Sequence, residues 1–140
     1  MSTAAQVAAD LGVLGAETAA ATHGVVVAFT AALQRGVVAR ASGVPVPIGP
    51  HGPGPNAVTG DYRRSISRRT VKTPGGSVGY VGTDKPQGRR LELGFTGTDS
   101  LGRSYDQPPY PHFGPALDEI AAPFEAAVAA LPGVVARRRL

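Results

Sequence analysis

The chain of 140 residues contains no cysteine and no tryptophan, and it has only four tyrosines and four phenylalanines. Without cysteine, disulfide bonds and thiolate metal sites are excluded. Aromatic residues make up 6% of the chain, and much of its 42% hydrophobic content is alanine. A chain of this length is expected to form a single domain, residues 1–140, with a modest core. Because neighbouring subunits often complete so thin a core, we expect self-assembly.

Residues with the spacing of a catalytic or metal site are missing as well. The three histidines lie in a predicted helix, a proline-rich loop and a proline-rich linker, and no pair has metal-ligand spacing. No zinc-protease helix motif, calcium loop or phosphate-binding loop is present. Glu92 stands beside Arg89 and Arg90, which favours a buried or interfacial salt bridge over a catalytic carboxylate. The sequence therefore predicts no enzyme, no cofactor and no metal.

Long hydrophobic runs are also lacking. The most lipid-like run, Gly24–Leu33, has ten residues, whereas a membrane-spanning helix needs about 18 or more. The N-terminus, MSTAAQVAAD, carries no Lys or Arg before its apolar part, unlike a secretory signal. We therefore expect a soluble protein without a membrane partner.

Positive charge is in excess, with a net charge of +4 and a pI near 10.0. Between Asp61 and Arg90 there are eight positive residues and two negative ones, a net charge of +6. This surplus indicates either a solvated sheet face or a surface opposite DNA or an acidic protein. The candidate contact residues are Arg63, Arg64, Arg68, Arg69, Lys72, Arg89 and Arg90.

Hydrophobic periodicity and turn residues predict an α+β fold, in which a long N-terminal helix and a C-terminal helix pack on a small antiparallel β-sheet. Thr73–Gly76 has hairpin chemistry between two strands. Gly88–Gly94 is consistent with either a helical turn or a short strand. Proline and glycine exclude regular structure in the arm that follows the first helix. The predicted segments are a helix at 3–41, broken at most once, a Pro/Gly-rich arm at 43–58, a β-sheet region at 59–94, a protruding loop at 95–107, a helix at 114–131 and a tail at 132–140.

The buried faces of the two helices follow from the same periodicity. An apolar stripe on the first helix recurs at alternating spacings of four and three residues: Val7, Leu11, Leu14, Thr18, Ala21, Val25, Phe29 and Ala32. It predicts one face packed on the sheet or, as the alternative, a helix–helix contact between subunits. The last helix is expected to end at Pro132–Gly133.

Three segments then resemble the neck and tail-completion proteins of long-tailed bacteriophages. They are TGDYRRSI (59–66), VGTDKPQGRRLELG (81–94) and PPYPHFGPALDE (108–119), in that order, and the resemblance covers about residues 59–131. Pro123, inside the last helix, departs from the family pattern.

The resemblance implies a virion protein at the head–tail junction, assembled in the host cytoplasm, that caps or completes the tail tube and joins it to the head. Related neck proteins form rings, commonly six-fold, so the implied partners are further copies, neck proteins on the portal, adaptor or stopper side, the tail-tube protein and, nonspecifically, genomic DNA. Candidate subunit-contact residues are Glu92, Phe95, Leu101, Tyr105 and Tyr110. The alternative, from charge alone, is a small sequence-nonspecific nucleic-acid-binding protein acting through Arg63–Arg69 and the Arg137–Arg139 tail.

Overall fold

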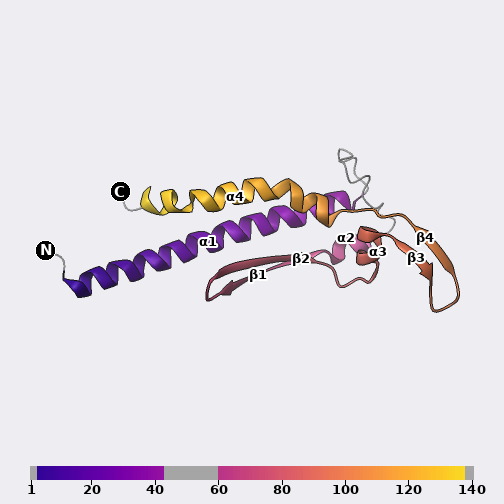
Figure 1. Ribbon diagram of the computed structural model, residues 1–140, viewed down its shortest axis with the longest axis horizontal. Helices are drawn as coiled ribbons and strands as arrows, with labels where there is room; N and C mark the ends of the chain where they lie inside the picture. The colour runs from indigo at the N-terminus through magenta and orange to yellow at the C-terminus, as the bar shows by residue number, and fades with distance from the viewer. Residues whose placement is uncertain (1–2, 43–59, 138–140) are drawn as a thin grey trace.

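A computed structural model describes residues 3–42 and 60–137 of the chain. The predicted arm at 43–58 and residues 138–140 lie outside these ranges. Along the chain the elements are a long helix, a short helix, a β-hairpin, a second short helix, a second β-hairpin and a final helix. Figure 1 shows the two long helices side by side with the hairpins beside and beyond them. The predicted α+β fold is confirmed.

Helix α1 (Ala4–Arg40) begins at a capping box and is assigned as one uninterrupted helix. The Thr3 hydroxyl accepts from the amide of Gln6 at 3.2 Å, and the Gln6 side-chain oxygen accepts from the Thr3 amide at 2.8 Å. Two amides at the start of the helix are thereby satisfied. By length and composition α1 could cross a membrane, but the core helix of a soluble protein or a signal sequence satisfies the same criterion. This feature therefore assigns no membrane role.

The core lies around the C-terminal half of α1, which is placed between α4 (Phe113–Arg137) and the first β-hairpin (Figure 1). The buried cluster consists of Val37, Ala41, Ile66 and Ala116. Gly36 lets α4 approach closely, because a Cβ atom at that position would lie 3.3 Å from the Cβ of Ala116. Small residues at the crossing thus set the distance between the two long helices.

The N-terminal part of α1 has no such cover. Every residue from 4 to 20 is exposed, and Figure 1 shows this end of α1 reaching beyond the other elements. Val7, Leu11 and Leu14, which the periodicity placed on a buried face, are 46%, 62% and 37% exposed. The expectation of a stripe packed within the chain along the whole helix is therefore wrong for this half. The tip of the hairpin at residues 72–77 only borders Leu11 and Leu14 across an open depression of about 790 Å³ and does not cover them.

The first hairpin consists of β1 (Ser67–Thr73) and β2 (Gly76–Gly82), paired antiparallel with Thr73 opposite Gly76. This confirms the hairpin predicted from Thr73–Gly76. Its inner face lies on α1 so closely that a Cβ atom on Gly79 would come within 1.8 Å of the Thr30 hydroxyl oxygen. The Nδ1 atom of His23 is 2.9 Å from the Ser77 hydroxyl, which ties the hairpin to the helix near its tip.

Two of the predicted segments contain more regular structure than the sequence pattern specified. The expected β-sheet region at 59–94 also contains the helix α2 (Asp61–Ser65), which was not predicted, and the helix α3 (Gln87–Leu93), which decides the ambiguity at Gly88–Gly94 in favour of a helix. The expected loop at 95–107 forms a second hairpin from β3 (Phe95–Thr98) and β4 (Ser104–Gln107). Both short strands lack apolar alternation, so pairing with each other rather than burial defines them.

Helix α4 continues to Arg137. The expected helix end at Pro132–Gly133 is therefore wrong, and residues 132–137 of the expected tail at 132–140 belong to the helix. Prolines 123 and 132 lie inside the helix. Each removes one amide and leaves the carbonyl four residues earlier without a helical donor. Those carbonyls belong to Glu119 and Val128, which are exposed. Water can therefore satisfy them, and the helix tolerates both prolines.

Candidate functional site

The three segments that carry the resemblance meet at one place, which we call the hub and define by Tyr62, Ser65, Thr83, Glu92 and His112. Tyr62 and Ser65 come from α2, Thr83 follows β2, Glu92 is on α3, and His112 precedes α4. The Ser65 and Thr83 hydroxyl oxygens are 2.5 Å apart. The hub therefore joins α2, α3 and the start of α4.

Glu92 holds the start of α4. Its carboxylate accepts hydrogen bonds from the backbone amides of His112 at 2.8 Å, Phe113 at 3.0 Å and Gly114 at 2.8 Å. These amides belong to the first turn of a helix, where donors have no carbonyl partner of their own. Burial raises the pKa of Glu92, but the three amides and the nearby His112 outweigh it, so the net pKa is lowered. The sequence predicted a buried or interfacial salt bridge at Glu92, and the structure places the Nδ1 atom of His112 3.1 Å from its carboxylate, an ion pair only when the histidine is protonated.

His112 is fully buried at the centre of the hub. Its Nδ1 atom lies 3.0 Å from the Tyr110 carbonyl and 3.1 Å from the Glu92 carboxylate. Because both neighbours are acceptors, Nδ1 carries the proton and Nε2 accepts from the Tyr62 hydroxyl at 2.6 Å. Burial lowers the pKa of His112, and burial with the charge of Glu92 raises the pKa of Tyr62 to about 12. The neutral pair is thus stable near neutral pH.

This geometry organises the backbone and presents no reactive group. The His112 ring has no exposed surface and both of its nitrogens are occupied within the hub. A general base must reach a substrate proton directly or through one water. Among the described residues, no group of three or more His, Cys, Asp or Glu side chains could hold a metal ion.

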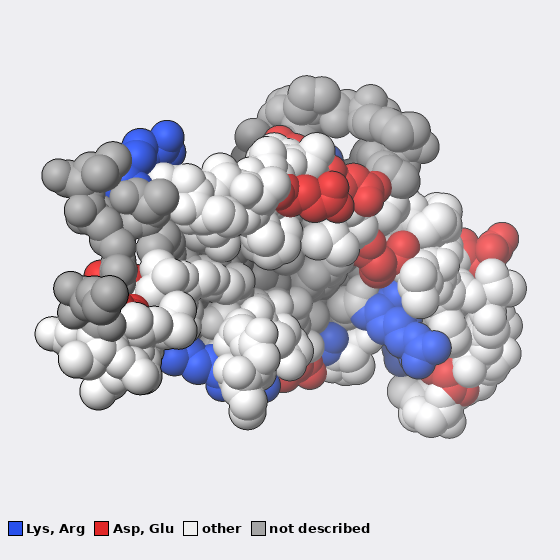
Figure 2. All heavy atoms as spheres, turned by 60° about the vertical axis from the view of Figure 1, so that its left-hand side comes forward, with Lys and Arg blue, Asp and Glu red and all other residues white. Residues whose placement is uncertain are grey.

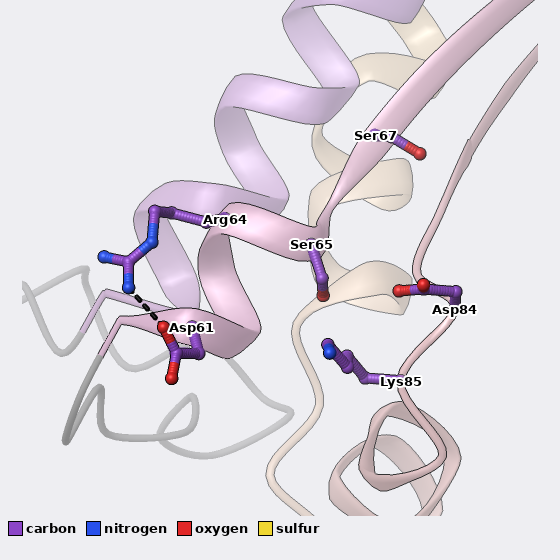
Figure 3. A pocket seen from close by; sticks show the side chains of 6 residues that line it. All are labelled: Asp61, Arg64, Ser65, Ser67, Asp84 and Lys85. Atoms are coloured by element: carbon purple, nitrogen blue, oxygen red, sulfur yellow. Dashed lines mark hydrogen bonds and ion pairs between the residues drawn. The ribbon is translucent and has the colours of Figure 1, made fainter.

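A polar depression of about 610 Å³ lies next to the hub (Figure 3) and is lined by Asp61, Arg64, Ser65, Ser67, Asp84 and Lys85. Asp61 and Arg64 form an ion pair and point toward each other, away from Lys85. The Ser65 hydroxyl donates to the Tyr62 carbonyl at 2.6 Å and contacts Thr83. With no histidine among the lining residues, Ser65 has no base to activate it as a nucleophile.

The candidate basic residues are spread over several surfaces rather than gathered on one. Arg68 and Arg69 are neighbours on β1 and so project to opposite faces of the hairpin. Arg68 donates to the Gln34 side chain on α1 at 2.8 Å, whereas Arg69 lies 5.2 Å from the Tyr80 ring centroid on the other face. Figure 2 shows basic side chains in separate groups with acidic ones between them on the face drawn. The sequence suggested a single arginine-rich surface.

The remaining basic candidates lie at three further places. Arg63 and Arg64 are exposed on α2, and Lys72 is near the tip of the first hairpin. Arg89 and Arg90 are exposed on α3, and the Arg90 guanidinium lies 4.2 Å from the Phe95 ring centroid.

The candidate subunit-contact residues fall into two groups. Phe95, Leu101 and Tyr105 belong to the second hairpin, where Leu101 is 75% exposed at the tip. Asp99 orders that tip, because its carboxylate accepts from the amides of Leu101 and Arg103, both at 2.9 Å, and from the Tyr105 hydroxyl at 3.1 Å. These bonds lower the pKa of Asp99, with the amide of Arg103 the largest cause.

The other two candidates, Glu92 and Tyr110, belong to the hub. The Tyr110 amide donates to the Leu91 carbonyl at 2.6 Å, and its own carbonyl accepts from His112. Their contacts in the structure are therefore within the chain.

Sequence reasoning missed Tyr62 and His112 as a pair and Asp99 as the organiser of a hairpin tip. A histidine between two prolines was a weak signal for burial. The turn residues around Asp99 could have indicated a local carboxylate–backbone turn, but the sequence predicted only a protruding loop there.

Comparison with known proteins assigns neither a family nor a function to this chain. No family model, no curated protein and no solved structure matches this chain. Its function therefore has to be inferred from its own residues and geometry.

Proposed function

We propose that the chain is a structural virion protein of the bacteriophage head–tail junction, a ring subunit of the tail-completion or tail-terminator type. The observation that carries the proposal is the hub. Segments 59–66, 81–94 and 108–119 resemble the phage neck proteins, and they converge on Tyr62, Glu92 and His112. Their hydrogen bonds set the positions of α2, α3 and α4, so these three motif residues have a structural part in the fold.

The exposed surface supports assembly with further copies. Every residue from 4 to 20 of α1 is exposed, and Val7, Leu11 and Leu14 among them are 46%, 62% and 37% exposed. Contiguous exposed apolar surface is typical of protein–protein contact sites. Burial of this surface between neighbouring copies would complete the thin core.

The positions of the basic side chains limit the proposed DNA contact. Arg63 on α2 and Arg89 on α3 are exposed and could face phosphates in a channel, while Arg68 is bonded to α1. In the proposed ring, the contact with genomic DNA is nonspecific and comes from scattered arginines rather than one continuous basic strand. The remaining proposed partners are the adjoining neck proteins and the tail-tube protein.

Electron microscopy of particles produced without this chain tests the proposal. The expected result is heads and tails that fail to join, or tails of irregular length, with normal particles restored by the wild-type gene in trans. Normal particles in the absence of the chain would contradict the proposal. In a salt-dependent gel shift, the free chain should bind DNA weakly, because its arginines do not form one surface. Tight binding at physiological salt would favour the nucleic-acid-binding alternative instead.

A further inference from the structure

Two apolar surfaces of the described chain lie open on different elements. The first is the exposed α1 segment, residues 4–20, where Val7, Leu11 and Leu14 form one stripe. The second is the outer ribbon face, the side of the first hairpin that points away from α1, formed by Arg69, Val71, Val78 and Tyr80. Val78 is 39% and Tyr80 51% exposed. Apolar surfaces of this kind on a small protein mark interaction sites.

The two surfaces carry opposite charge. The exposed α1 segment contains Asp10 and Glu17, and the chain has no Lys or Arg before Arg35. At helical spacing Asp10 and Glu17 border the same side of the apolar stripe. On the outer ribbon face, Arg69 lies over Tyr80 and is exposed. An acidic apolar helix face therefore has a basic apolar counterpart on the same molecule.

The dimensions of the two surfaces also match. Seventeen residues of α-helix are about 25 Å long, and the seven residues of β1 or β2 extend for about 23 Å. On the ribbon, Val71 stands opposite Val78 and Arg69 opposite Tyr80. A Cβ atom on Gly82, at the end of the same face, would meet nothing within 4 Å. The ribbon thus offers an open strip of about the right length for a helix.

The chain already uses this kind of packing once. The C-terminal half of α1 lies on the inner face of the ribbon, where Thr30 fits against Gly79 and His23 contacts Ser77. The exposed α1 segment continues the same helix beyond that contact. A two-stranded ribbon is marginal by itself, and cover on its second face would stabilise it.

We propose that the exposed α1 segment of one copy packs on the outer ribbon face of the next copy. This inference rests on the proposed self-assembly and specifies which two surfaces of neighbouring copies are in contact. Because the two surfaces differ, the contact is head-to-tail, and such contacts close into a ring when the rotation between copies allows it. The ribbon then lies between two helices, one from its own chain and one from its neighbour.

The absence of cysteine allows a direct test by disulfide cross-linking. Leu14→Cys places a thiol on the exposed α1 segment, and Val78→Cys places one on the outer ribbon face. Leu117→Cys is the matched control, because Leu117 is 53% exposed on α4 and belongs to neither surface. Each variant is oxidised alone and in equal mixtures with the others, at a concentration at which light scattering shows the wild-type chain to be oligomeric. Products are separated on a non-reducing gel.

The mixture of Leu14→Cys and Val78→Cys should give a covalent dimer, while each variant alone and mixtures with Leu117→Cys remain largely monomeric. Self-linked Leu14→Cys would indicate a symmetric helix–helix contact and overturn the proposal.

Exchange of the charges on the two surfaces provides a second, independent test. Asp10→Arg and Arg69→Glu should each weaken association about tenfold or more, and mixing the two variants should restore it. Failure of both single reversals to weaken association would also contradict the proposal.

The outcomes separate this contact from the proposed function. If light scattering shows a ring but Leu14→Cys and Val78→Cys give no cross-linked dimer, the proposed contact is overturned. The virion role is then tested only by the morphology of particles made without the chain. A chain that stays monomeric at every concentration would also overturn the contact. So would binding of the exposed α1 segment to lipid vesicles, measured as flotation of the chain with the vesicles. Particle morphology without the chain remains the independent measure of the virion role.

Discussion

Glu92→Gln provides a sharp test of the hub. In the native chain the carboxylate accepts from three amides at the start of α4, and its side chain is only 20% exposed. Loss of a helix-capping acceptor costs about 1 kcal/mol, and each lost bond to a charged acceptor costs about 1.5–3 kcal/mol. The glutamine keeps one neutral acceptor oxygen, so we expect a loss of about 1–2 kcal/mol in the free energy of unfolding. Glu92→Ala should lose about 2–4 kcal/mol.

Urea denaturation followed by circular dichroism measures these losses. Glu125→Gln is the control, because it removes an exposed carboxylate from the same helix α4 and should change stability by less than about 0.5 kcal/mol. Equal unfolding midpoints for Glu92→Gln and the control would refute the idea that Glu92 holds the start of α4.

The pH dependence of the Glu92→Gln effect has a definite sign. The folded pKa of Glu92 lies below its ordinary value of 4.5, so the unfolded chain takes up the proton first as the pH falls. The stability from Glu92 is then fully present above pH 4.5 and is lost as the pH falls through the folded pKa. Wild type and variant should therefore differ most near neutral pH and converge in acid. A difference that stays constant down to about pH 3 would contradict the charged role of Glu92.

Two other substitutions test the packing and the hub independently. Gly79→Ala should cost about 1–3 kcal/mol of unfolding free energy, because its new methyl would overlap the Thr30 hydroxyl; Gly82→Ala, which meets open space, should cost less, and equal losses would refute the close contact. Tyr62→Phe should cost about 1–3 kcal/mol because it leaves the buried Nε2 atom of His112 without its donor. In a spectroscopic titration the same variant should lose the tyrosine that ionises near pH 12, and an unchanged titration curve would count against the bond.

Much of the architecture could be predicted from local sequence signals. Thr73–Pro74–Gly75–Gly76 specified the first hairpin, because those residues favour a tight turn between two strands. Long apolar periodicity indicated both main helices. Helix α2 was not predicted, and α3 was only one of two alternatives for Gly88–Gly94, because five and seven residues are too few for a periodic pattern to develop. Their ends are defined by the hub and by neighbouring turns.

The candidate site was predicted only in part, since its contacts connect distant residues. Glu92 was recognised as unusual from its apolar surroundings, but its partners lie 20 to 22 residues away and are backbone amides. Amides carry no sequence signal, so the sequence predicted a buried or interfacial salt bridge at Glu92 and not a role in holding the start of a helix. The hydroxyl of Tyr62 reaches His112 across 50 residues, and no local pattern indicates such a pair. The sequence placed Arg68 and Arg69 together on an outward-facing surface, whereas the structure turns Arg68 toward Gln34 on α1 and Arg69 toward Tyr80 on the other face.

Cryo-electron microscopy of the phage particle that encodes this chain tests the central claim most directly. The account predicts a closed ring of identical copies between the head and the tail tube, with α1 and the first hairpin of adjacent copies in contact. A complete junction built without this chain, with the chain located elsewhere or absent from the particle, would contradict it.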